Sequence, residues 1–382
     1  MAVYITDLAA FLPNAPISNE QMEQVLGMVN QVPSRTRRII LRNNRIESRH
    51  YAIDPQTGQT THTNAQLTAE AIRRLHPFPG FSTSDIECLG CGTSSPDQIM
   101  PGHGQMVHGE LGGAPCEVMS AAGICMSGMA AMKYAYMNVA LGLTRNAVAA
   151  GSELASTFLR SRLCDPVAPG RAEALEEQPV LSFEADFLRW MLSDGAGAAF
   201  LSDRPAADRV SLRIDWIDLV SFANELDTCM YAGATMNEDG LLTGWRDQPS
   251  RTEAAANGTF LIKQDVKLLN KEIVITAADR TLPRLMDRYG LQADQVDWFL
   301  PHYSSDFFRL QLYERMKTIG FHIPLERWFT NLAKKGNTGA ASIFIILEEL
   351  FHSGRIEKGQ TLLCFIPESG RFSMCYMLLT AV

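Results

Sequence analysis

Hydrophobic and polar positions recur in the same order in the two halves of the chain. In the first half, the amphipathic residues 69–75 predict a helix and residues 86–92 predict a buried strand. In the second half, residues 278–286 predict the helix and residues 294–300 the strand. A polar loop follows each strand. The repeated order predicts βαβ units with mostly parallel, buried strands, and therefore an internal duplication.

Composition fits a chain of two such units. The chain has 382 residues, of which 46% are hydrophobic and only 20% charged, so it can bury a large core. We place the two α/β halves at residues 1–205 and 206–382. This division separates the two copies of the repeated pattern.

Other features of the composition exclude several classes of partner. No apolar run approaches the roughly 20 residues that span a bilayer, so we expect no membrane partner. Val3, Tyr4 and Ile5 predict a first strand where an export signal would lie, which favours a cytoplasmic protein. The formal net charge of -8 argues against a nucleic-acid partner.

The eight cysteines are expected to be reduced thiols, because a long chain without an export signal rarely depends on disulfides. Cys88 and Cys91 form a CxxC pair inside the first predicted strand. No second pair follows at zinc-finger spacing, so metal or redox use of this pair is only the alternative. We expect no metal site.

Cys125 has the sequence surroundings of a nucleophile. It lies in a run of small residues, 120–128, directly before a helix predicted at residues 129–143. A helix N-terminus carries a partial positive charge and free N–H groups, which predicts a shift of the thiol toward thiolate. Gly123 and Gly128 allow close approach of a substrate. The alternative is a small buried residue in the core.

Two distant polar residues complete a possible constellation with Cys125. His302 follows the predicted strand of the second half, and Asn337 lies in residues 335–342. A cysteine, a histidine and an asparagine far apart in sequence can meet in the fold as a nucleophilic site. The alternatives are an ordinary loop histidine and an asparagine that caps the helix predicted at residues 338–350.

These segments closely resemble the ketosynthase III (beta-ketoacyl-ACP synthase III) branch of the thiolase-fold condensing enzymes, whose catalytic residues are Cys, His and Asn. Further segments share the resemblance in the same order: Arg45-Ile-Glu-Ser-Arg49, Thr93-Ser-Ser-Pro-Asp97, Gly151-Ser-Glu153, Ser193-Asp-Gly-Ala-Gly-Ala198 and Glu368-Ser-Gly370. The resemblance implies a pseudo-duplicated thiolase fold with five layers, αβαβα. The N-terminal half would supply Cys125, and the C-terminal half His302 and Asn337.

The resemblance also implies the chemistry. Cys125 would attack an acyl thioester and store the acyl group, which divides C–C bond formation into two easier steps. A carbanion on the second substrate would arise by decarboxylation or by loss of an α-proton. His302 and Asn337 would then donate hydrogen bonds to the enolate oxygen. The backbone N–H groups of Cys125 and Gly370 would hold the acyl carbonyl oxygen.

One departure from the family concerns the thioester donor. Common members hold the adenine of coenzyme A with a tryptophan, and residues 34–49 contain none. The same stretch is basic on an acidic protein, and arginine suits phosphate and carboxylate groups. We expect Arg38, Arg42 and Arg45 to bind an acyl carrier protein and its phosphopantetheine arm. The alternative is a solvated charged face.

Cofactor and assembly follow from the resemblance. The protein would hold no cofactor of its own, because the phosphopantetheine arrives on the carrier protein or as coenzyme A. A homodimer is expected, in which residues 98–104 reach the acyl tunnel of the neighbouring subunit.

The second departure concerns the product. Glu153 ends a predicted strand, where it is either a structural hydrogen-bond acceptor or a general base that removes an α-proton. Additional residues at 163–184 and 229–259 are similar to ketosynthase/cyclases that form cyclohexanedione precursors of dialkylresorcinols and related stilbene and aryl-polyene secondary metabolites. Two alternatives remain. One is an ordinary fatty-acid priming synthase that uses acyl-CoA and malonyl-ACP, and the other is a noncatalytic partner subunit of a condensing complex.

Overall fold

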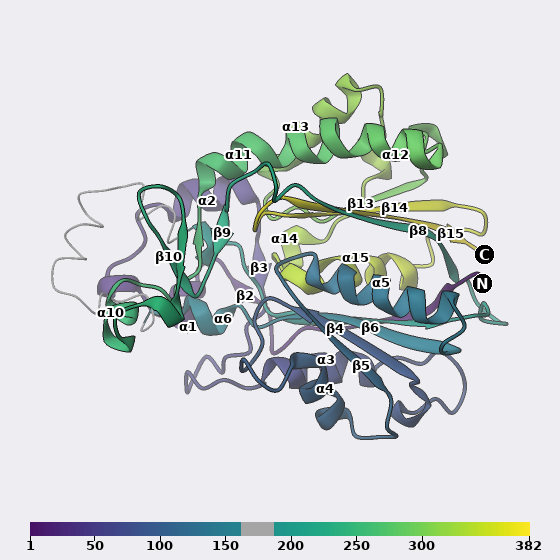
Figure 1. The fold of residues 1–382 in the computed structure, drawn as a ribbon, viewed down its shortest axis with the longest axis horizontal. Coiled ribbons are helices and arrows are strands. Elements are labelled where there is room, and N and C mark those ends of the chain that lie inside the picture. The colour runs from purple at the N-terminus through teal and green to yellow at the C-terminus, as the bar shows by residue number, and fades with distance from the viewer. Residues whose placement is uncertain (162–186) are drawn as a thin grey trace.

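The computed structural model of the protein describes residues 1–161 and 187–382. These residues form five stacked layers: outer helices, a sheet, a central pair of helices, a second sheet and further outer helices (Figure 1). This is the αβαβα layering that the sequence predicts. The extra residues expected at 163–184 lie outside the described residues.

Nine strands form the two sheet layers, which are hydrogen-bonded into one continuous sheet. In spatial order they are β13 (Trp298–Pro301), β14 (Thr361–Glu368), β15 (Ser373–Ala381), β8 (Leu212–Ser221), β1 (Tyr4–Phe11), β7 (Gly195–Ser202), β6 (Asn146–Glu153), β4 (Cys88–Thr93) and β5 (Glu117–Ala122). Only Tyr4 and Ile5 of β1 pair with β8, and this short contact joins the two layers. The division that we predict after residue 205 falls in the loop between β7 and β8.

The pairing pattern repeats between the two layers. From β1 through β7 and β6 to β4, the pairs are antiparallel, antiparallel and parallel. The series β8, β15, β14 and β13 has the same three relations in the same order. The internal repeat visible in the sequence therefore has a counterpart in strand pairing.

The expectation of mostly parallel strands is wrong. Three pairs in the described sheet are parallel and five are antiparallel. The cause lies in the connections. For example, only residues 369–372 separate β14 from β15, and so short a turn produces a hairpin rather than a crossover to a parallel neighbour.

Helices cover both faces of each sheet (Figure 1). The central layer contains α5 (Ser127–Ala140) and α15 (Ser342–His352), and the outer layers contain α3 (Asn64–Arg73) and α4 (His103–Leu111) on one side and α11 (Val266–Ile275), α12 (Leu282–Tyr289) and α13 (Phe307–Thr318) on the other. In α15, Ile343, Phe344, Ile345, Ile346 and Leu347 are all buried. A helix that is apolar all round belongs between two layers, so this sequence explains its central place.

The remaining short elements lie around one end of the layers. They are α1 (Met22–Leu26), α2 (Arg37–Asn44), α6 (Ser156–Leu159), α10 (Arg251–Ala256), α14 (Leu332–Lys335), β2 (Ile17–Ser18), β3 (Ser48–Arg49), β9 (Met230–Tyr231), β10 (Ala234–Met236), β11 (Leu242–Gly244) and β12 (Lys263–Gln264). Among the described residues, no helix is both long and apolar enough to cross a membrane.

Two glycines bring the central helices and the first sheet unusually close. A Cβ atom on Gly128 of α5 would lie 2.3 Å from the Ala340 carbonyl oxygen, and one on Gly151 of β6 would lie 2.2 Å from the same atom. A real side chain cannot tolerate such contacts. The absence of side chains at both positions therefore lets the backbone around Ala340 pack directly against the segments that carry Cys125 and Glu153.

Candidate active site

A cavity of about 330 Å³ lies at the end of the central layer. Its walls include Cys125, Glu153, His302 and Asn337, which come from four different segments of the chain. The rest of the wall is largely apolar and comes mainly from α11, α13 and residues near 190. The structure thus brings four of the predicted site residues together around one cavity.

Cys125 is buried and stands directly before Met126, the residue that caps α5. Its pKa is raised, first by burial and then by the nearby carboxylates of Glu368 and Glu153. The expectation that the helix N-terminus shifts this thiol toward thiolate is therefore wrong for the free protein. Loss of hydration and two acidic neighbours outweigh the helix terminus, which favours the thiolate only modestly.

His302 follows β13 and is held by its backbone. Its N–H donates to the Phe365 carbonyl of β14 at 2.8 Å. Burial lowers the pKa of the imidazole to about 4, because the charged form loses its hydration. His302 is therefore neutral at neutral pH, so its ring has one nitrogen that can donate and one that can accept a proton.

Asn337 is fixed by both backbone and side chain. Its N–H donates to Met191, its carbonyl accepts from Ser193 at 2.8 Å, and its Oδ1 accepts from the N–H of Gly339 at 3.0 Å. Because Oδ1 is used in this way, the carboxamide NH₂ is the group that can act in the cavity. The helix that follows begins at Ser342, with Ala341 as its cap, so Asn337 does not cap α15.

Glu153 is the buried last residue of β6. Its Oε1 accepts hydrogen bonds from the hydroxyls of Ser94 (2.6 Å) and Ser95 (2.5 Å), and its Oε2 accepts from the N–H of Ala340 at 3.2 Å. Burial raises its pKa, and the three hydrogen bonds partly counteract that effect. The carboxylate is thus held rigidly on the cavity wall. Its hydrogen bonds are those of a structural acceptor, and its place on the wall is one from which a base can act.

Known proteins are similar to this chain in both sequence and fold. The model of the family described as "3-Oxoacyl-[acyl-carrier-protein (ACP)] synthase III C terminal" matches residues 286–370. A "Beta-ketoacyl-[acyl-carrier-protein] synthase III" of Chlorobaculum tepidum is 26% identical over 365 residues, which are 95% of this chain and 94% of the relative. The matched C-terminal region includes His302, Asn337 and Gly370.

The chain is similar to ketosynthase III enzymes over nearly its whole length. It is a condensing acyltransferase with the thiolase fold. Solved structures agree on the fold: the tetronic acid condensing enzyme AbyA1 has a TM-score of 0.72 at 21% identity, with 99% of both chains covered. The 3-oxoacyl-(acyl carrier protein) synthase III of Pseudomonas aeruginosa has a TM-score of 0.71 at 19% identity, with 100% of this chain and 98% of that chain covered.

Gly370 lies in the turn between β14 and β15, close to the nucleophile segment. A Cβ atom there would lie 2.8 Å from Cδ1 of Ile124, the residue before Cys125. Its carbonyl accepts hydrogen bonds from the N–H groups of Cys229 (2.9 Å) and Met230 (3.2 Å). The turn is thereby tied to the extra segment predicted at residues 229–259, which lines the cavity through Met230 and Tyr231.

The predicted arginines lie outside the cavity. Arg38 and Arg42 are exposed on α2, and Arg45, directly after the helix, forms an ion pair with Asp306 at 3.2 Å. None of the three is among the residues that line the described cavity. They lie close to it, however, because the Asp306 N–H donates to the Asn44 carbonyl at 3.2 Å and so ties the end of α2 to the loop that follows His302.

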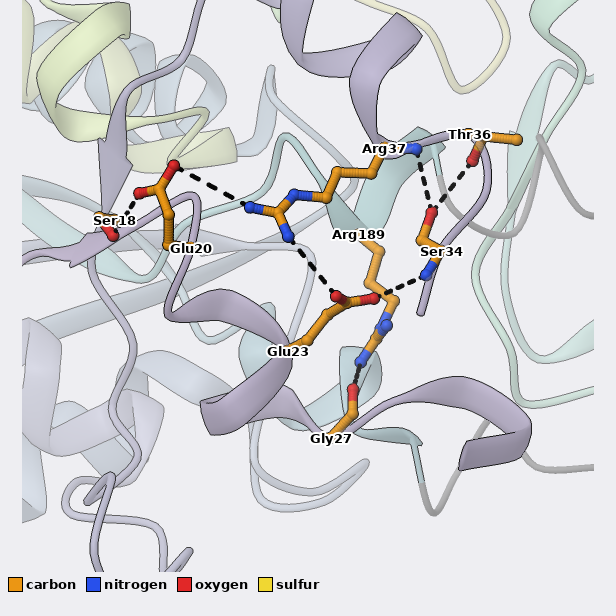
Figure 2. A network of polar contacts seen from close by, with 8 residues as sticks. All are labelled: Ser18, Glu20, Glu23, Gly27, Ser34, Thr36, Arg37 and Arg189. Carbon is orange, nitrogen blue, oxygen red and sulfur yellow. Dashed lines mark hydrogen bonds and ion pairs between the residues drawn. The ribbon is translucent and has the colours of Figure 1, made fainter. Parts of the chain in front are cut away.

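Other arginines of the same basic stretch have structural partners. Figure 2 shows Arg37 between the carboxylates of Glu20 and Glu23, at 4.0 and 3.7 Å, while Glu23 also accepts from the Ser34 N–H at 2.8 Å. Arg49 is fully buried and donates to Asn19 and to the Trp190 carbonyl. The basic stretch therefore divides into residues that fix the fold and residues that face solvent.

The sequence did not reveal the roles of Glu368, Ser94 and Ser95. Ser94 and Ser95 hold Glu153, and Glu368 contacts the turn that carries Cys125. Each lies in a segment that resembles the family, but no local sequence pattern indicates its partner. Gln264, a buried residue of β12, also lines the cavity and donates to the Ser369 hydroxyl at 2.9 Å.

Proposed function

We propose that the protein joins acyl and β-ketoacyl thioesters by Claisen-type condensation through an acyl group on Cys125. The observation that carries this proposal is the convergence of Cys125, His302 and Asn337 on one mostly apolar cavity. A thiol stores the acyl group, and two neutral donors suit an enolate oxygen whose charge develops only in the transition state. The backbone N–H groups of Cys125 and Gly370 would hold the acyl carbonyl oxygen.

A panel of acyl and β-ketoacyl carrier proteins tests this function directly. We expect intact mass spectrometry to show an acyl adduct on Cys125, followed by a product in which two acyl groups are joined. An adduct without any condensed product from any pair of substrates would contradict the proposal.

We further propose that an acyl carrier protein delivers the thioester, docking on the exposed Arg38 and Arg42 beside the cavity. These residues lie four apart on α2 and so share one face. The names of the curated relatives, beta-ketoacyl-[acyl-carrier-protein] synthase III, support a carrier as partner. The alternative is a priming synthase that uses acyl-CoA, and a structural neighbour, OleA of Xanthomonas campestris, was solved with lauroyl-CoA.

Reversing both charges with Arg38→Glu and Arg42→Glu should raise the apparent KM for an acyl carrier protein on the order of 5- to 10-fold. Exposed ion pairs are worth about 0.2–1 kcal/mol each, and reversal replaces attraction with repulsion. Turnover of the wild-type protein with carrier substrates should also fall with salt, because the Debye length shrinks from about 10 Å at 0.1 M to about 3 Å at 1 M. Initial rates over a carrier concentration series would measure both effects.

A matched control reverses Arg204 and Lys358, which are exposed near the strand ends opposite to the cavity. This variant should keep the wild-type KM. Acylation of Cys125 by a small pantetheine thioester should be unchanged in both variants. The docking role would be contradicted if coenzyme A thioesters were used with equal efficiency, or if turnover did not respond to salt and to charge reversal. Arg38 and Arg42 would then be ordinary solvated residues.

We also propose that the protein closes a ring after condensation, with Glu153 as the base that removes an α-proton. Its carboxylate lines the cavity with Cys125, and burial raises its pKa toward the range in which a base works well. The extra segment at residues 229–259, which lines the cavity, supports a substrate larger than that of a priming synthase. We also propose that the protein is a homodimer in which residues 98–104 reach the acyl tunnel of the neighbouring subunit.

Glu153→Gln should lower ring-closed product by about 10²–10⁴-fold while Cys125 is still acylated, because glutamine has a similar shape but cannot accept the proton. The base must be ionised, so ring closure in the wild-type protein should fall with acid at a higher pH than an ordinary glutamate would give. Product analysis by mass spectrometry measures this, with thermal unfolding as the control for the fold. Equal loss of Cys125 acylation would instead indicate a purely structural carboxylate.

A further inference from the structure

Glu368 contacts the backbone on both sides of Cys125. It is the last residue of β14, and its Oε2 accepts hydrogen bonds from the N–H groups of Ile124 and Met126, each at 3.2 Å. Ile124 and Met126 are the neighbours of Cys125 in sequence, and Met126 is the N-terminal cap residue of α5. A carboxylate from the C-terminal half therefore occupies the amides that surround the nucleophile.

This position has an electrostatic consequence for the thiol. Free amides at a helix N-terminus normally stabilise a thiolate. Here a carboxylate accepts from the amide of the cap residue Met126 and from that of Ile124, just before the helix, and its negative charge acts on the nearby thiol. The charged and titratable groups that act on Cys125 or share its cavity are Glu368 from β14, Glu153 from β6, Tyr231 of β9, and His302 and Tyr303 after β13, and the histidine is neutral. Among these groups there is no cation that could offset the two carboxylates.

We propose that Glu368 is a positioning residue that keeps Cys125 as a thiol in the resting enzyme, so that acyl transfer requires His302 to accept the thiol proton. The inference rests on the proposed role of Cys125 as the acyl carrier. It adds a step that the family resemblance did not supply, since the resemblance assigned His302 to the enolate only. The direction of the Cys125 pKa, raised in part by Glu368, agrees with this arrangement.

In the proposed step, one thioester is exchanged for another. The Cys125 sulfur bonds to the thioester carbonyl carbon while its proton moves to the free nitrogen of the neutral His302 ring. The bond between that carbon and the pantetheine sulfur then breaks. The leaving sulfur takes the proton back from His302, so the ring is neutral again before condensation begins.

The experiment measures the pH dependence of Cys125 alkylation by iodoacetamide, with the modified residue mapped by mass spectrometry. Glu368→Gln keeps an acceptor for the two amides but removes the charge. We expect the apparent thiol pKa to fall by about one unit or more, and alkylation at pH 7 to become about tenfold faster, since thiolate fraction changes tenfold per unit. Glu357→Gln, an exposed change before the same strand, should leave the profile unchanged.

A second measurement tests the need for a base. His302→Ala should acylate Cys125 slowly, and the double variant His302→Ala with Glu368→Gln should recover part of that rate because its thiol ionises more readily. If the Glu368→Gln protein does not fold, Glu368→Ala, which removes both the charge and the acceptor, provides a second comparison of the thiol pKa. A profile identical to wild type in the folded variant, or no recovery in the double variant, would overturn the proposal.

Failure of the proposed function would look different. In that case the wild-type protein would not transfer an acyl group to Cys125 at all, while the alkylation profile would still report whether Glu368 controls the thiol.

Discussion

Cys125→Ala protein is expected to form no product, with turnover lower by at least about 10⁴-fold, because removal of a covalent nucleophile leaves only binding and orientation. The fold should survive. Cys125 is a small buried residue, and loss of one sulfur from such a site costs about 1 kcal/mol. Product formation measures the first effect and thermal unfolding the second.

Cys88→Ala provides the matched control for Cys125→Ala. Cys88 is also buried, but it lies in β4, and burial raises its pKa to about 12. This variant should turn over normally and should still take an acyl group. An acyl label on Cys88 or Cys91, or an unchanged rate in Cys125→Ala, would contradict the assignment of the nucleophile.

Asn337→Ala should lower condensation by about 10²–10³-fold, the usual cost of removing one donor to a developing oxyanion. Acylation of Cys125 should remain close to wild type, because the carboxamide is proposed to act only on the enolate. Single-turnover acylation, followed by addition of the second thioester, separates the two steps.

His302→Ala should behave differently from Asn337→Ala. The resemblance alone implies that both residues serve the enolate, which would spare acylation in both variants. The buried, neutral imidazole lines the same cavity as a protonated thiol, which predicts that His302→Ala slows acylation as well, by about 10²–10⁴-fold. If His302→Ala acylates Cys125 at the normal rate, then the histidine acts only on the enolate.

The pKa values of His302 and Cys125 determine how the rate of Cys125 acylation depends on pH. Burial lowers the pKa of His302 to about 4, so the imidazole stays neutral, and able to accept a proton, down to about that pH. The thiol of Cys125 has a raised pKa and stays protonated at neutral pH. These directions explain why a base is needed and why His302 is able to provide it.

Local pattern was sufficient for most elements but not for their ends. The helix predicted at residues 69–75 belongs to α3, which begins earlier, at Asn64, because Thr63 caps it there. The strand predicted at 294–300 overlaps β13 only from Trp298 onward, since Ala293–Gln295 form a short 3₁₀ turn. The helix predicted from residue 338 begins at Ser342, after a separate 3₁₀ turn of Gly339–Ala341.

Some site residues can likewise be predicted from the sequence, and others cannot. The residue types and their order along the chain pointed to Cys125, His302 and Asn337, because a nucleophile and its partners have recognisable surroundings. In the sequence, the arginines of residues 34–49 form one basic stretch, whereas in the structure Arg37 pairs with acidic residues and Arg49 is buried. Charge in a sequence does not reveal which side chains find partners.

The sequence by itself determined the α/β class, the internal repeat, the order of the motifs and the three residues now seen at one cavity. These depend on periodicity and on residue types that are close along the chain. Only the tertiary structure decided the antiparallel pairing of β14 with β15, the contact of Glu368 with amides some 244 positions earlier and the protonated state of Cys125. The reason is physical: pairing, burial and electrostatic interaction depend on which groups meet in space, and groups far apart in the chain leave no mark on each other's local sequence.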